Sequence, residues 1–284
     1  MRLILLGVLI FICLHPVLAA TPCPNGVHPI VELVDREDGT CARLFGGCIN
    51  GKWVRPEIIV PKIKGRLTYR LYTATRYLGE AVGKDASLGE DNEVVQIPGV
   101  TMGRLPKDAV HVDGPIIGIC GTWNAQPRKP REQKTDQPVY RQVVHDYLTR
   151  KGLATAPIYI SHIQRVDLDG NGTDEVLIYA SSMKDIDSLP EKEAGYYSVV
   201  LLRKIINGKV KTIPVAEGFV EHPGKDLLEF TRYTQAALLD VNGDGELEVA
   251  IGYQLSGSIY GEGITIFQIT GDTVKDVLSE GGAE

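Results

Sequence analysis

Several features that would assign this chain to a familiar class are scarce or missing. Only five cysteines occur in 284 residues, which excludes a small scaffold held together by many disulfides. Basic residues are not in excess, because 30 Lys and Arg face 36 Asp and Glu, giving a net charge of −6. That balance disfavours a nucleic-acid binder, which needs a basic surface. No apolar run reaches the roughly 20 residues of a membrane-spanning helix.

The remaining composition is that of a globular protein rich in turns. Hydrophobic residues make up 43% of the chain and charged residues 23%, so global disorder is not expected. The 31 glycines and 16 prolines indicate many turns rather than long helices. The length is compatible with one large domain or two smaller ones.

The first nineteen residues have the layout of a secretory signal peptide. Arg2 is followed by the apolar run Leu3–Leu14, and Val17–Ala19 provides small residues for cleavage. This arrangement predicts an exported protein, located in the periplasm, at the cell surface or outside the cell. A retained membrane anchor is the alternative, but the mature chain contains no predicted membrane span.

The mature chain keeps four cysteines, Cys23, Cys41, Cys48 and Cys120. An even number in an exported chain predicts one or two disulfides, and the three ways of pairing four cysteines stay open. The segment between Cys41 and Cys48 has the residues of a hairpin tip, which would bring these two together. A zinc site would need more closely spaced pairs.

Residues 20–126 are predicted to be a β-rich N-terminal region. Alternation of residue types along 66–73 is typical of a half-buried strand. Turn signals separate short candidate strands, which are Lys52–Val54, Glu57–Val60, Leu67–Ala74 and Pro115–Cys120.

Residues 127–137 are polar and proline-broken, which predicts an exposed connector. The alternative is a basic patch for an anionic polymer. A helix is predicted at about 138–151, because apolar residues recur on one face. Pro138 suits its first turn and Gly152 its end.

Two acidic, glycine-containing loops are the strongest signal in the sequence. The first runs Asp-Leu-Asp-Gly-Asn-Gly-Thr-Asp-Glu over residues 167–175, and the second runs Asp-Val-Asn-Gly-Asp-Gly-Glu-Leu-Glu over residues 240–248. Oxygen-bearing side chains at positions 1, 3, 5 and 9, with a backbone carbonyl at position 7, can surround one Ca²⁺. The predicted ligands are Asp167, Asp169, Asn171, Thr173 and Glu175 in the first loop, and Asp240, Asn242, Asp244, Glu246 and Glu248 in the second.

The residues that follow each loop differ from those of an EF-hand. Position 12 is Ile178 in the first loop and Ile251 in the second, where an EF-hand has a Glu followed by a helix. Each loop instead continues into a strand-like segment, at 176–179 and at 249–253. Each loop is therefore predicted to join two strands.

The pattern Asp-x-Asp/Asn-Gly-Asn/Asp-Gly-x-x-acid followed by a hydrophobic strand resembles the calcium loop of FG-GAP/VCBS-type repeats, found in integrin-alpha-like β-propellers. The resemblance covers about residues 160–280 and implies two structural Ca²⁺ ions. Position 9 differs, because Glu175 and Glu248 stand where the family usually has Asp.

The predicted fold is therefore mostly β. Residues 138–284 would hold the helix and two propeller-like repeats with calcium-binding hairpin loops, at about 160–216 and 235–280. Further strands are expected at Tyr196–Leu202, Lys209–Ile213, Gly263–Ile269 and Thr273–Leu278. The region 20–126 would form degenerate repeats or a separate β domain.

No catalytic constellation is recognisable, since both the Gly-x-Ser-x-Gly elbow and the His-Glu-x-x-His zinc motif are absent. The sequence therefore favours a non-enzymatic binding module for an extracellular protein or glycan. The alternatives are a carbohydrate-active hydrolase or lyase, and a purely structural envelope component. Trp123, Tyr253 and Tyr260 are candidate platforms for sugar rings, or else packing residues.

Overall fold

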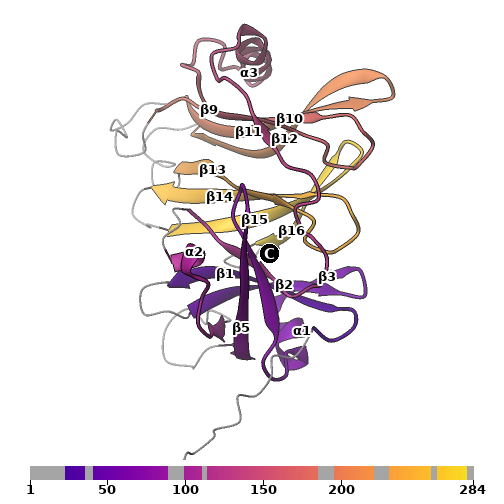
Figure 1. Cartoon of the computed structure of the whole chain (residues 1–284). Helices are drawn as coiled ribbons and strands as arrows, with labels where there is room; N and C mark the ends of the chain where they lie inside the picture. The colour runs from indigo at the N-terminus through magenta and orange to yellow at the C-terminus, as the bar shows by residue number, and fades with distance from the viewer. Residues whose placement is uncertain are drawn as a thin grey trace, which may run out of the picture.

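The computed structural model describes residues 23–35, 41–88, 99–110, 114–184, 195–220, 230–256 and 261–279. Three antiparallel sheets and one longer helix lie above one another as layers (Figure 1). The mostly β prediction is confirmed. The predicted signal peptide lies outside the described residues. Within the described ranges, no helix is both long enough and apolar enough to cross a membrane.

The N-terminal layer is a seven-stranded sheet. Its strand order is β1-β7-β4-β5-β6-β2-β3, and β1 also pairs with β2, so the pairings return to the first strand. This sheet has its own hydrophobic core, which includes Leu44, Tyr69 and Leu71. The strands are β1 (Val27–Asp35), β2 (Cys41–Ile49), β3 (Lys52–Val54), β4 (Thr68–Tyr72), β5 (Tyr77–Ser87), β6 (Gly99–Met102) and β7 (Ile117–Ile119).

Two local predictions in this region are wrong. Glu57–Val60 is not a strand, because α1 (Pro56–Ile59) and the 3₁₀ turn η1 (Val60–Lys62) occupy it. Pro56 lies in the first turn of α1, where its fixed φ and missing N–H suit a helix start. Ile59 is buried while Ile58 is exposed, so this apolar run is one helical turn. A second short helix, α2, spans Lys107–Val110.

The cysteines do not form the hairpin that their spacing suggested. Cys41 and Cys48 both lie on the single strand β2, and Cys48 is a free, buried thiol. The disulfide joins Cys23 to Cys120, which are 97 residues apart. This cross-link ties the segment before β1 to the end of β7, two strands that pair directly.

The sheet at the other end of the stack is a five-stranded meander covered by a helix, called here the helix-covered layer (Figure 1). The predicted helix is confirmed as α3 (Pro138–Arg150), and its buried residues Tyr140, Val144, Tyr147 and Leu148 pack on this sheet. The strands follow in sequence order and are β8 (Arg131–Glu132), β9 (Tyr159–Val166), β10 (Glu175–Ser181), β11 (Tyr196–Ile206) and β12 (Lys209–Val220). Within the predicted connector, Arg131 and Glu132 therefore pair as an edge strand.

The third layer is a four-stranded meander between the other two (Figure 1). Its strands are β13 (Phe230–Leu239), β14 (Glu248–Ser256), β15 (Gly261–Thr270) and β16 (Thr273–Ser279). One face packs against β9–β12 through residues such as Leu177 and Val249. The opposite face packs on the N-terminal sheet, where Ile119 and Ile266 belong to one cluster.

The two meanders repeat the same register around their loops. Glu175 pairs with Val166 across the first hairpin, and Glu248 pairs with Leu239 across the second. In each case the last loop residue therefore faces the residue just before the loop. The next ladder also matches, because β10 pairs with β11 and β14 with β15 at equivalent positions. The sequence repeat is thus a structural repeat.

Candidate metal centre

The first acidic loop connects β9 to β10 and is closed by its own carboxylates. Asp167 accepts hydrogen bonds from the backbone N–H groups of Asn171 at 3.0 Å and Gly172 at 2.9 Å. Glu175 reaches back to accept from the Leu168 N–H at 2.8 Å. The Asn171 side-chain oxygen accepts from the Thr173 N–H at 2.8 Å. Side chains at positions 1, 5 and 9 therefore all turn inward.

The second loop, between β13 and β14, has the same frame. Asp240 accepts from the Gly245 N–H at 3.0 Å, and Glu248 accepts from the Val241 N–H at 2.8 Å. Asp244 accepts from the Glu246 N–H at 2.8 Å. These are the bonds that positions 1, 9 and 5 make in the first loop. The glycines at positions 4 and 6 have positive φ in both loops, which this curl requires.

The two loops touch each other at the junction of the helix-covered layer and the third layer. The Leu247 N–H donates to the Leu168 carbonyl at 2.8 Å. Arg128 joins them, since its guanidinium donates to the backbone carbonyls of Asp167, Leu168 and Gly245. Trp123 donates its indole N–H to the Asp240 carbonyl at 2.8 Å. The segment before β8, which carries Trp123 and Arg128, therefore forms hydrogen bonds to both loops.

The first loop brings three carboxylates close enough to share a metal ion. Asp167, Asp169 and Glu175 each offer an oxygen, and these oxygens lie within 4.8 Å of one another. Glu175 is 2% exposed, and burial, opposed by the Leu168 N–H and by Lys204, raises its pKa. Carboxylate oxygens are the preferred ligands of hard divalent cations. This cluster could therefore hold a metal ion.

A lysine from β11 already contacts this cluster. The Lys204 ammonium lies 2.7 Å from the Asp169 carboxylate and 3.5 Å from that of Glu175, and its side chain is 6% exposed. Burial disfavours the charged forms, but the hydrogen bonds and the charge attraction together outweigh it, lowering the pKa of Asp169 and raising the pKa of Lys204. The first loop therefore contains an internal cation.

The second loop concentrates negative charge without such a partner. Among the ion pairs of the described residues, none involves Asp240, Asp244 or Glu248. Glu248 is 1% exposed. Its burial, reinforced by the charges of Asp244 and Asp240 against the Val241 N–H, raises its pKa to about 8. Burial also raises the pKa of Asp240.

The remaining predicted ligands of the second loop fall into two groups. The Asn242 amide donates to Asp244 at 2.8 Å and to Glu248 at 3.4 Å, so it lies among the carboxylates. Glu246 is exposed, and position 7 was predicted to contribute through its backbone carbonyl, as at Thr173. The structure thus places the Asn242 amide between Asp244 and Glu248. The carboxylates of Asp240, Asp244 and Glu248 do not approach one another as closely as those of the first loop, which form the one such cluster among the described residues.

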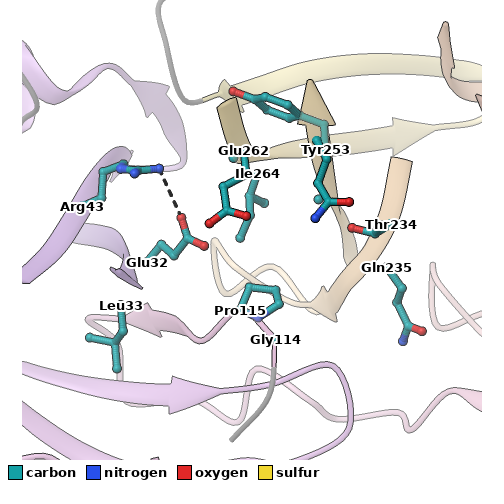
Figure 2. A pocket seen from close by; sticks show the side chains of 13 residues that line it. Glu32, Leu33, Arg43, Gly114, Pro115, Thr234, Gln235, Tyr253, Glu262 and Ile264 are labelled. Atoms are coloured by element: carbon teal, nitrogen blue, oxygen red, sulfur yellow. Dashed lines mark ion pairs between the residues drawn. The ribbon is translucent and has the colours of Figure 1, made fainter. Parts of the chain in front are cut away.

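A separate cavity of about 620 Å³ lies between the N-terminal sheet and the third layer. Figure 2 shows its polar lining, with Glu32 and Arg43 on one side and Tyr253 and Glu262 on the other. Glu32 and Arg43 form an ion pair at 3.7 Å. The volume falls in the range of small-molecule sites.

The three aromatic candidates have different surroundings. Tyr253 lines the cavity, as the sugar-platform prediction requires. Trp123 is a packing residue, because its ring meets His28 edge-on at a centroid distance of 4.9 Å and its N–H is bonded within the metal-loop region. Tyr260 lies outside the described residues.

Comparison with known proteins adds no family to these observations: no family model, curated protein or solved structure matches the chain. The sequence did not point to Lys204 or Arg128 as parts of the site. Neither residue belongs to a loop motif, and only the folded register brings them there. The one available signal was the pair Arg203 and Lys204 in the largely apolar strand Tyr196–Ile206.

Proposed function

We propose that this chain is an exported calcium-binding β-repeat protein that acts as a binding module. Its two meanders would be successive blade-like repeats of the FG-GAP/VCBS type. The ligand would be an extracellular molecule, and calcium would be a structural ion of the repeated loops.

The observation that carries this proposal is the common frame of the two loops. Positions 1, 5 and 9 make the same backbone hydrogen bonds twice, with the same strand register. Plain turns do not need an oxygen-bearing side chain at each of these positions. The second loop buries Asp240 and Glu248, and neither forms an ion pair with another residue that the structure describes. Buried carboxylates are normally compensated by cations, and Ca²⁺ prefers oxygen ligands.

The position of the loops supports a structural role for the ion. Leu247 and Leu168 link the loops directly, and Arg128 spans both, so an ion there would stiffen the junction between two sheets. Extracellular calcium fills sites with dissociation constants of about 10⁻⁴–10⁻³ M. With free calcium at ten times the dissociation constant, one site adds about 1.4 kcal/mol to the free energy of unfolding.

The cavity supports the binding role and favours a glycan. Its walls combine amide, carboxylate and guanidinium groups with the ring of Tyr253, which suits hydroxyl-rich ligands better than an apolar molecule. The carbohydrate-active alternative rests on the same cavity, because Glu32 and Glu262 both line it. Glycan turnover that is lost in Glu262→Gln would replace the binding proposal with that alternative. If deleting the protein damaged the cell envelope and the purified protein bound no glycan, the alternative of a purely structural envelope component would be favoured.

Thermal unfolding of the mature chain, residues 20–284, tests the calcium proposal. We expect a higher midpoint in millimolar CaCl₂ than in EDTA, because the ion binds the folded loops but not the unfolded chain. Millimolar MgCl₂ serves as the control, since the smaller ion demands a stricter octahedral geometry. Identical midpoints in EDTA and in calcium would mean that the loops are ordinary turns that bind no calcium.

A further inference from the structure

The two loops differ in the source of positive charge. Lys204 lies in β11, one residue beyond the pair Val176↔Arg203, which places it opposite Glu175. Residues directly opposite in an antiparallel pair project to the same face of the sheet. The 3.5 Å contact between the Lys204 ammonium and Glu175 follows from this placement. Asp169 adds the closer contact, at 2.7 Å.

The equivalent position of the second repeat carries no charge. Val249 pairs with Phe267, so the residue opposite Glu248 is Gln268. Its amide oxygen accepts the indole N–H of Trp53 at 3.3 Å. The repeat therefore places a lysine beside one set of carboxylates and a glutamine beside the other.

We propose that the Lys204 ammonium occupies the cation position of the first loop, so that the native chain binds calcium at the second loop only. The claim about the second loop rests on the proposed function; the claim about Lys204 stands on the first loop alone. It changes the expected content from two calcium ions per chain to one.

The contacts explain why the ammonium and a metal ion exclude each other. Calcium binds oxygen at 2.3–2.6 Å, and the ammonium is already 2.7 Å from Asp169. Both cations would share the oxygens of Asp169 and Glu175 at distances where like charges repel strongly. An entering ion would have to expel Lys204, whose side chain is 6% exposed. Separating the Lys204 ammonium from its carboxylate partners inside the protein would leave its positive charge buried and unpaired.

This arrangement gives the two repeats different dependence on calcium. The first loop has a covalently attached counter-charge, so its carboxylates are compensated as soon as β11 pairs with β10. The second loop is compensated only when an ion is supplied from solution. Lys204 and Gln268 would thus determine which repeat responds to calcium.

Exchanging the two residues tests the proposal by counting bound calcium after equilibrium dialysis. We expect one ion per chain in the native protein, two in Lys204→Gln and none in Gln268→Lys. Lys204→Arg is the matched control for the first site, since it keeps the positive charge and should gain no ion. Gln268→Met is the control for the second, since it removes the bond to Trp53 without adding charge and should keep its ion.

Each outcome separates this proposal from the proposed function. Two ions in the native chain, or no additional ion in folded Lys204→Gln, would overturn the role of Lys204. No ion in the native chain but one in Lys204→Gln would uphold that role and reject native calcium binding. If Lys204→Gln does not fold, Gln268→Lys decides: an unchanged ion count there overturns the proposal, and loss of the ion with Gln268→Met unaffected supports it.

Discussion

Breaking the Cys23–Cys120 disulfide is expected to lower the free energy of unfolding by about 4–5 kcal/mol. The bond closes a loop with a sequence separation of 97 residues, and restricting the unfolded chain over that length has an entropic effect of this size. The double variant Cys23→Ser/Cys120→Ser should show the loss in urea denaturation. Cys120 is fully buried, which protects the bond in the folded state.

The matched control for this prediction is Cys48→Ala. Cys48 is a free thiol, 1% exposed, in the same sheet, so its replacement removes packing but no cross-link and should cost about 1 kcal/mol. A reducing agent should destabilise the native chain and leave the double variant unchanged. Equal stability of the native chain with and without reductant would contradict the assignment of the disulfide.

Raising the pH from about 5 to about 8 is expected to destabilise the calcium-free protein. Burial raises the pKa of Glu248 from 4.5 to about 8 in the folded state. Between these two values the folded chain keeps a proton that the unfolded chain has lost. The stabilisation is complete below the lower pKa and disappears as the pH rises through the upper one. At 1.36 kcal/mol per pH unit, the change in free energy of unfolding is on the order of 4 kcal/mol.

The variant Glu248→Gln separates this effect from general pH sensitivity. Its neutral amide resembles the protonated carboxyl, so in EDTA at pH 8 it should be more stable than the native chain, and its stability should vary less between pH 5 and 8. In calcium the order should reverse, because the ion needs the ionised carboxylate. Glu246→Gln is the control, since that side chain is exposed. Parallel pH profiles for the native chain and Glu248→Gln in EDTA would refute the prediction.

The parts of the fold that could be predicted from sequence are those determined by local residue patterns. The helix at 138–150 follows from its apolar stripe and Pro138. The loops follow from oxygen-bearing residues and glycines at fixed spacing, and their flanking strands from the apolar runs after them. In each case the decisive neighbours lie within one element or one turn.

The parts that sequence did not predict depend on contacts between distant segments. The pairing of Cys23 with Cys120 depends on β1 lying beside β7, which no local spacing reveals. Lys204 reaches the first loop only through the β10–β11 register. The run at 57–60 has apolar residues suited to a strand, but Pro56 and one buried side chain make it a helical turn. Tertiary packing overrides strand propensity there.

The decisive measurement is a calcium titration of the metal-stripped mature chain near pH 8, monitored by isothermal calorimetry. We expect saturable binding of one calcium ion per chain, with a dissociation constant at or below about 10⁻³ M. That ion should be absent in Glu248→Gln. No binding by the native chain up to about ten times that concentration, or equal binding by Glu248→Gln, would contradict the assignment of the second loop as a calcium site.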